Sequence, residues 1–353
     1  MRILLWHVHG SWTDAFVQGG HDYLLPTTVP GDPWGLGRAG RDWPERAVDV
    51  PADHLHDADI DCIVLQRPRE VELCEQLLGV RPGRDVPAVF VEHNTPRVDV
   101  PNSLHVLADR SDIPVVHVSY FNDLFWECGR APTTVIEHGI VDPGALYTGE
   151  LPRMAAVINE PVRRWRVTGT DLLSRFGTAG PVDLFGIPDR APVDPLVSAS
   201  GVQHRGDLPS GQLHAALARR RLYVHPARWT SLGLSLIEAM HLAMPVLVLA
   251  TTEAVRAVPP EAGAISTNVD ELVATARVLL ADPDEARRRG LLARRAALTH
   301  YGLALFLRRW DEVLDDVTRR AHGRLPALDP GARAHKVSAA DTAAAAGPKG
   351  SPR

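Results

Sequence analysis

The chain has 353 residues, of which 45% are hydrophobic and 23% charged, and its formal net charge is −5. A chain of this length exceeds one comfortable hydrophobic core, so we expect two domains. The composition is that of an ordinary soluble protein. The acidic balance gives no reason to propose a nucleic acid as a partner.

The sequence carries no mark of secretion or of membrane insertion. Its three cysteines, Cys62, Cys74 and Cys128, are widely spaced and form no CxxC pair, which argues against a disulfide framework or a zinc site. Residues 1–10 lack the features of a signal peptide, and no apolar run approaches the ~20 residues that cross a bilayer. We expect a cytoplasmic protein and leave peripheral contact with the inner membrane face open.

Short apolar strands alternate with helical stretches along the whole chain. This alternation predicts an α/β fold with parallel sheets covered on both faces. The predicted strands of the first half are Ile3–Val8, Cys62–Leu65, Ala88–Val91, Val115–Val118 and Thr134–Ile136, and those of the second half are Met154–Ile158, Val182–Phe185, Leu222–Val224 and Val246–Leu249.

Turn-forming residues interrupt the periodicity between Asp142 and Pro152, which places the domain boundary there. A helix is expected from about Leu303 to Arg320, and from Ala334 the chain has no periodic apolar face, which is typical of disorder. The predicted division is 1–148, 149–302, a helix over 303–322 and a disordered tail over 323–353.

Two patterns of the first half imitate ligand motifs. Gly35, Gly37 and Gly40 match the spelling of the dinucleotide fingerprint, but no strand precedes them and no helix follows, so a surface loop is predicted. The acidic run 57–61 resembles a metal-binding motif, yet it leads directly into the strand at Cys62. A helix-to-strand connection explains it without a metal.

Residues 222–250 predict a strand, a tight turn, a helix and a strand. The first strand ends at Pro226, and Gly233 permits close approach of a ligand where the helix begins. The free amides at a helix start attract anions, so residues 231–233 can hold a diphosphate. Glu238, further along the helix, can accept both hydroxyls of a ribose.

This segment resembles the donor-binding motif of retaining glycosyltransferases of the GT-B fold, family 4 (glycosyl transferases group 1). The family motif has two glutamates separated by seven residues. Glu238 matches the second, and Thr230 stands in place of the first. The resemblance implies two Rossmann-like domains facing across a cleft, a C-terminal helix that crosses back to the first domain, and catalysis without a metal or cofactor. The alternative is the helix-start turn of any α/β protein, with Glu238 solvated.

A basic segment follows the strand that ends at Ile158. Its arginines, Arg163, Arg164 and Arg166, can bind phosphate bidentately. In the family an arginine precedes a lysine-glycine pair by five residues. Arg163 matches that arginine, and Thr168 replaces the lysine. We expect Arg163 and Arg166 to be catalytic and Arg164 to bind the donor; a solvated basic turn is the alternative.

The other candidate site residues lie at strand ends. His93 follows a strand at the sheet edge where α/β proteins bind ligands. It resembles the family histidine beside donor sugar and acceptor, and a structural histidine is the alternative. Gly10 resembles the loop near the donor phosphates, and backbone around Gly186 is expected to contact the base. The predicted donor-binding residues are thus Gly10, Arg164, Gly186, Thr230, Ser231, Leu232 and Gly233, and the catalytic ones are His93, Arg163, Arg166 and Glu238.

These residues predict transfer of a hexose-type sugar from a nucleotide-diphosphate sugar to a hydroxyl of a small-molecule, lipid or glycan acceptor. The resemblance implies retention of configuration, with the leaving phosphate taking the acceptor's proton. Two alternatives share the architecture: a degenerate nucleotide-sugar-binding protein and a nucleotide-sugar 2-epimerase. The sequence gives no oligomeric state.

Overall fold

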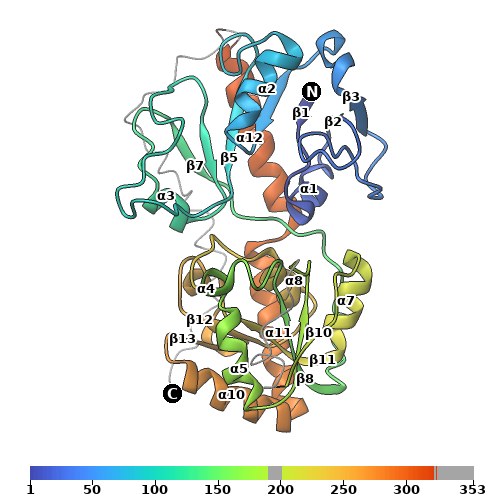
Figure 1. Cartoon of the computed structure of the whole chain (residues 1–353), viewed down its shortest axis with the longest axis vertical. Helices are drawn as coiled ribbons and strands as arrows, with labels where there is room; N and C mark the ends of the chain where they lie inside the picture. The colour runs from blue at the N-terminus through green and yellow to red at the C-terminus, as the bar shows by residue number, and fades with distance from the viewer. Residues whose placement is uncertain (190–200, 322, 324–353) are drawn as a thin grey trace, which may run out of the picture.

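The computed structural model describes residues 1–189, 201–321 and 323. They form two α/β domains that lie one above the other along the long axis of the molecule (Figure 1). Among the described residues the first sheet has seven parallel strands in the order β3-β2-β1-β4-β5-β6-β7. The strands are β1 (Arg2–Leu5), β2 (Asp22–Thr27), β3 (Ala47–Pro51), β4 (Cys62–Leu65), β5 (Ala88–Glu92), β6 (Val115–His117) and β7 (Thr133–Val135).

The first sheet is buried on both faces. Successive residues of β4 alternate between two hydrophobic clusters, with Cys62 and Val64 in one and Ile63 and Leu65 in the other. This alternation follows from the two-residue period of a strand. Short helices connect the strands: α1 (Gly10–Phe16), η1 (Ala52–Asp57), α2 (Arg69–Leu78) and α3 (Tyr120–Phe125).

The second sheet repeats this arrangement with six parallel strands among the described residues, in the order β10-β9-β8-β11-β12-β13. They are β8 (Leu151–Val157), β9 (Val182–Phe185), β10 (Val202–His204), β11 (Arg220–His225), β12 (Val246–Leu249) and β13 (Gly263–Ser266). The accompanying helices are α4 (Trp165–Thr168), η2 (Thr170–Leu172), α5 (Leu173–Gly177), α7 (Ser210–Arg219), α8 (Leu234–His241), α9 (Ala254–Ala257), η3 (Pro260–Ala262), α10 (Val269–Ala281) and α11 (Pro283–His300).

The last helix, α12 (Leu303–Ala321), returns to the first domain. Figure 1 shows it running alongside the upper sheet, although α11 packs in the lower domain. Its buried side chains join the first domain's core, where Trp310 meets Trp12 and Phe16 edge to face at ring-centroid distances of 5.7 and 5.1 Å. The prediction of a crossover helix from about Leu303 to Arg320 is confirmed.

Four strands, β2, β3, β10 and β13, were not predicted. Strand β2 contains Pro26 and β3 ends in Pro51, and proline argues against a strand in the sequence. The chain passes between the domains after β7 ends at Val135 and before β8 begins at Leu151. Of the predicted tail, residues 324–353 lie outside the described residues, as does residue 322. No helix in the described part of the chain is long and apolar enough to span a membrane.

Candidate functional site

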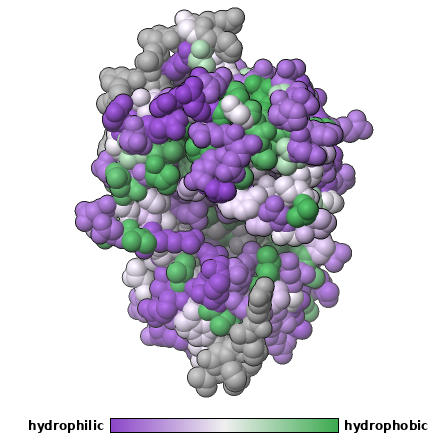
Figure 2. Space-filling view, turned by 45° about the horizontal axis from the view of Figure 1, so that its top comes forward, coloured by the Kyte–Doolittle hydropathy of each residue, from purple (hydrophilic) through white to green (hydrophobic). Residues whose placement is uncertain are grey.

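A cavity of about 1370 Å³ lies between the two domains and is lined by both. Figure 2 shows a hollow in the surface between the upper and lower parts of the molecule. The carboxyl ends of parallel strands face it, as is general for ligand sites of α/β sheets. Of the predicted site residues, the cavity lining includes Gly10, His93, Arg164, Gly186, Thr230, Ser231, Leu232, Gly233 and Glu238.

The turn of residues 226–233, which we call the donor turn, connects β11 to α8. Its position depends on two glycines. A Cβ on Gly233 would lie 2.5 Å from Cε1 of His225, and one on Gly169 would lie 1.8 Å from the carbonyl oxygen of Pro226. Gly169 also has a φ of +72°, which favours glycine. The donor turn therefore packs directly against α4, and its residues 229–233 line the cavity.

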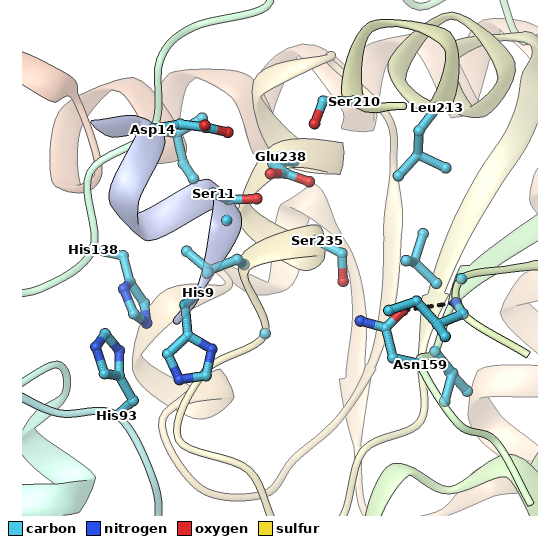
Figure 3. Close-up of a pocket in the computed structure, with 18 of the residues that line it drawn as sticks. His9, Ser11, Asp14, His93, His138, Asn159, Ser210, Leu213, Ser235 and Glu238 are labelled. Atoms are coloured by element: carbon cyan, nitrogen blue, oxygen red, sulfur yellow. Dashed lines mark hydrogen bonds between the residues drawn. The ribbon is translucent and has the colours of Figure 1, made fainter. Parts of the chain in front are cut away.

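Glu238 lies on α8 with its buried carboxylate toward the cavity. Burial alone would raise the pKa of this carboxyl, but His214, on α7, and the Ser11 hydroxyl, on α1, hold the pKa below its ordinary value. The His214 Nε2 lies 3.6 Å from a carboxylate oxygen of Glu238. Ser11 and Glu238 lie close together in Figure 3 although they belong to different domains. The carboxylate is thus ionised and able to accept hydrogen bonds from hydroxyl groups.

The structure does not bring Arg163 and Arg166 into the cavity. Arg163 is exposed and paired with Glu160, whereas Arg166 is exposed and paired with Asp171. Arg164, which directly precedes α4 in the turn of residues 161–164, faces the cavity instead. The positions of Arg163 and Arg166 do not support the prediction that these two side chains bind a diphosphate.

Arg164 is half-buried at the start of α4 and has no hydrogen-bond or ion-pair partner among the described side chains. Burial lowers the pKa of its guanidinium, and the positive charges of Arg97 and Arg163 lower it further. A cation held in this way favours an anionic ligand. Arg97, which sequence reasoning did not select, also lines the cavity.

His93 lies just after β5, where its Nε2 is 2.9 Å from Oε1 of Gln66. The Gln66 amide nitrogen donates to the carbonyl oxygen of Trp6 at 2.7 Å, which fixes the orientation of the amide. His93 must therefore donate from Nε2 and keep the Nδ1 lone pair as an acceptor. Burial, followed by the charges of His9 and His138, lowers the pKa of His93 well below its ordinary value, so the ring is neutral.

Two further histidines, His9 and His138, gather beside His93 (Figure 3). The rings of His9 and His93 lie 4.3 Å apart, centroid to centroid. Burial lowers the pKa of His9 to about 4 and that of His138 to about 3, and the buried Nδ1 of His138 has no hydrogen-bond partner among the described residues. Within the described residues no group of three or more His, Cys, Asp or Glu is arranged to hold a metal ion. The cluster is a neutral set of hydrogen-bonding groups.

The remaining donor candidates occupy the edges of the cavity. Gly10 opens α1, and a Cβ there would meet the guanidinium of Arg41 at 2.3 Å. Gly186 follows β9 with a φ of +118°. Beside it Asn159 Oδ1 accepts a hydrogen bond of 3.0 Å from the amide of Ile187, the dashed line in Figure 3. Backbone at this edge is therefore held in place by side chains.

Hydrogen bonds from the donor turn join the two domains beside the cavity. The Ser231 hydroxyl donates to the carbonyl oxygen of His93, and the indole of Trp229 donates to the carbonyl oxygen of Pro96, both at 2.7 Å. They place the donor turn of the second domain against the loop of residues 93–97 in the first domain.

Comparison with known proteins assigns part of the chain to a family. Residues 199–295 match the family model described as glycosyl transferases group 1, which confirms the predicted resemblance to this family. None of the curated proteins matches the sequence.

Solved structures with the same architecture share little sequence with this chain. The sucrose-phosphate synthase of Thermosynechococcus elongatus has a TM-score of 0.66 and 16% identity, over 91% of this chain and 100% of that one. Anabaena HepE, solved in complex with UDP-glucose, has a TM-score of 0.65 and 14% identity, over 90% and 100%. A point mutant of S. aureus TarM, solved with UDP, has a TM-score of 0.60 and 13% identity over 72% of this chain, which spans only 55% of TarM. The chain has the GT-B fold.

Proposed function

We propose that this protein is a glycosyltransferase that moves a hexose-type sugar from a nucleotide-diphosphate sugar to an acceptor hydroxyl, with retention of configuration and without a metal. The observation that carries the proposal is the ionised, buried Glu238 beside the donor turn, in a cavity that both domains line. A ribose on Glu238 places its diphosphate near the donor turn and Arg164. The family match of residues 199–295 supports the same assignment.

In the proposed reaction the bond between the sugar's anomeric carbon and the diphosphate oxygen breaks, and the electron pair leaves with the diphosphate. The acceptor hydroxyl attacks from the same face, and its proton passes to the departing phosphate oxygen. Arg164 and the amides of the donor turn stabilise the charge that develops there. Nδ1 of His93 accepts a hydrogen bond from a sugar hydroxyl.

A nucleotide-sugar-binding protein without turnover is a second candidate. It is favoured by Thr230 and Thr168, which stand where the family has a glutamate and a lysine. The acceptor class, the cytoplasmic location and any peripheral membrane contact remain predictions from the sequence.

The test is thermal denaturation with UDP, GDP, ADP and their glucose conjugates, followed by assay of nucleoside diphosphate release. Stabilisation by one nucleotide series together with sugar transfer supports the enzyme. Stabilisation without release from the glucose conjugate or from other sugar conjugates of that base supports the binding protein. No stabilisation by any series contradicts both.

A further inference from the structure

We propose that Arg97, on the first domain, contacts the leaving diphosphate together with Arg164 and supplies the second positive charge that the donor site needs. This inference rests on the proposed function. In this arrangement each domain contributes one positive charge to the leaving group: Arg97 comes from the first domain and Arg164 from the second.

The described residues of the second domain do not supply this second charge. Thr168, which stands where the family has a lysine, is buried, and its hydroxyl lies 3.0 Å from that of Thr170. Arg166, the expected replacement, is 72% exposed at its side chain and pairs with Asp171 outside the cavity. Asp171 is also bound by Arg228, at 2.6 and 2.8 Å. Among the described residues, the second domain therefore offers Arg164 alone as a cation on this side of the cavity.

The fold brings Arg97 to the same place. Arg97 follows Pro96, whose carbonyl oxygen accepts the hydrogen bond from Trp229. Trp229 directly precedes Thr230 in the donor turn. Arg97 is exposed, and its side chain donates only to Asn94 Oδ1, at 3.3 Å, among the described residues. It is free to turn toward a ligand in the cavity.

The charges of the lining are unbalanced at this point. The cavity residues from segments 93–97, 157–168 and 225–235 include Arg97 and Arg164 but no aspartate or glutamate within the described chain. Three of the carboxylates elsewhere in the lining have partners of their own: Asp14 pairs with Arg41, Asp142 with Arg294, and Glu238 with His214. Two neighbouring guanidinium groups without a carboxylate suit a ligand that carries two negative charges, and a diphosphate is such a ligand.

The contribution to the reaction is electrostatic. When the bond to the anomeric carbon breaks, the electron pair stays on the diphosphate, whose charge increases until the acceptor's proton arrives. A second arginine beside this oxygen stabilises the transition state more than the bound donor. Neither arginine gives up a proton, because a guanidinium stays charged throughout.

The experiment compares Arg97→Gln with a matched control, Arg84→Gln, an exposed arginine of the same domain that pairs with Asp112 outside the cavity. Calorimetric titration uses the diphosphate and the monophosphate of whichever base stabilises the native protein in the thermal denaturation test, and is followed by hydrolysis of the glucose conjugate of that base, in which water replaces the acceptor. Arg97→Gln should weaken diphosphate binding roughly tenfold, leave monophosphate binding unchanged and slow hydrolysis roughly 100-fold. Arg84→Gln should match the native protein.

A second substitution tests whether the lost quantity is charge. Thr168→Lys in the Arg97→Gln background should restore diphosphate affinity and most of the hydrolysis, and Arg97→Lys should be intermediate. Equal melting temperatures without ligand show that each variant is folded. Native diphosphate affinity and hydrolysis in Arg97→Gln would overturn the inference, as would failure of Thr168→Lys to restore either. If the native protein binds no nucleotide, the proposed function itself fails.

Discussion

The indole Nε1 of Trp229 donates a hydrogen bond to the carbonyl oxygen of Pro96 at 2.7 Å, from the donor turn of one domain to a loop of the other. Phe121 and Phe125 of α3 pack edge to face against the same indole, at ring-centroid distances of 5.3 and 5.7 Å. Position 229 therefore connects the relative placement of the domains to the turn proposed to hold the donor.

Replacing Trp229 by Phe keeps an aromatic ring and removes the donated hydrogen bond. One neutral hydrogen bond contributes about 0.5–1.5 kcal/mol, so the arrangement with the domains together should become about 2- to 10-fold less favoured. We expect a larger radius of gyration in solution without ligand and a similar loss of donor affinity, measured by X-ray scattering and calorimetry. An unchanged scattering profile would show that this bond does not hold the domains together.

Glu238→Gln should abolish the stabilisation by nucleotide, because the amide replaces one acceptor oxygen with a donor. In the native protein, ligand at one hundred times its Kd adds about 2.7 kcal/mol to the free energy of unfolding. The control is Glu150→Gln, an exposed carboxylate paired with Arg219, which should keep the full shift. Melting curves with and without ligand decide between them, and a full shift in Glu238→Gln would place the ribose elsewhere.

Gly169→Ala should displace the donor turn. Its Cβ would lie 1.8 Å from the carbonyl oxygen of Pro226, and the residue has a φ of +72°. We expect lower thermal stability and the loss of most nucleotide affinity, since α4 and the donor turn can no longer pack together. Gly211→Ala is the comparison: it lies on α7 with nothing within 4 Å of the added Cβ, and alanine should stabilise that helix by up to about 1 kcal/mol.

The histidines of the cluster beside His93 make the stability of the fold depend on pH. Burial lowers the pKa of His9 to about 4 and that of His138 to about 3, whereas both return to about 6.5 on unfolding. Between these values the unfolded chain binds more protons, so the free energy of unfolding falls as the pH drops from 6.5 toward 4. Each histidine contributes up to about 1.4 kcal/mol per pH unit. Melting temperatures measured from pH 7.5 to 4.5 should fall only below about pH 6.5, and a constant melting temperature down to pH 5 would contradict these pKa values.

The lowered pKa values of His9 and His138 also predict how the activity depends on pH. A reaction that needs His9 and His138 neutral should keep its rate well below pH 6.5, as far as the fold persists. A rate of donor hydrolysis that halves near pH 6.5 would indicate a histidine of ordinary pKa in the rate-determining step.

The sequence predicts the buried parts of the fold best. Strands β4, β9 and β12 have the predicted bounds, and every residue of each is buried. By contrast, β3 exposes three of its five residues and carries Asp49, so the pattern of a covered strand is absent. Periodicity reports burial, and it is weakest where a strand lies at the edge of a sheet.

The site shows a different limit. The order of motifs along the chain predicts the donor turn and Glu238, but not which of three nearby arginines faces the cavity. The irregular turn of residues 161–164 before α4 sets the directions of Arg163 and Arg164, and no spacing in the sequence gives its shape. His9, His93 and His138 come from three different strand ends. Their cluster depends on the tertiary fold, and no spacing in the sequence indicates it.

The crossover helix has a consequence for synthesis on the ribosome. The first domain's core includes Phe306, Trp310, Leu314 and Val317, which are translated after the whole second sheet. Until α12 has been translated, the core of the first domain is therefore incomplete, and part of the apolar surface around Trp12 and Phe16 is uncovered. A stop codon after β13 would leave that surface exposed for good, and we expect such a fragment to bind chaperones or aggregate even though both sheets are present.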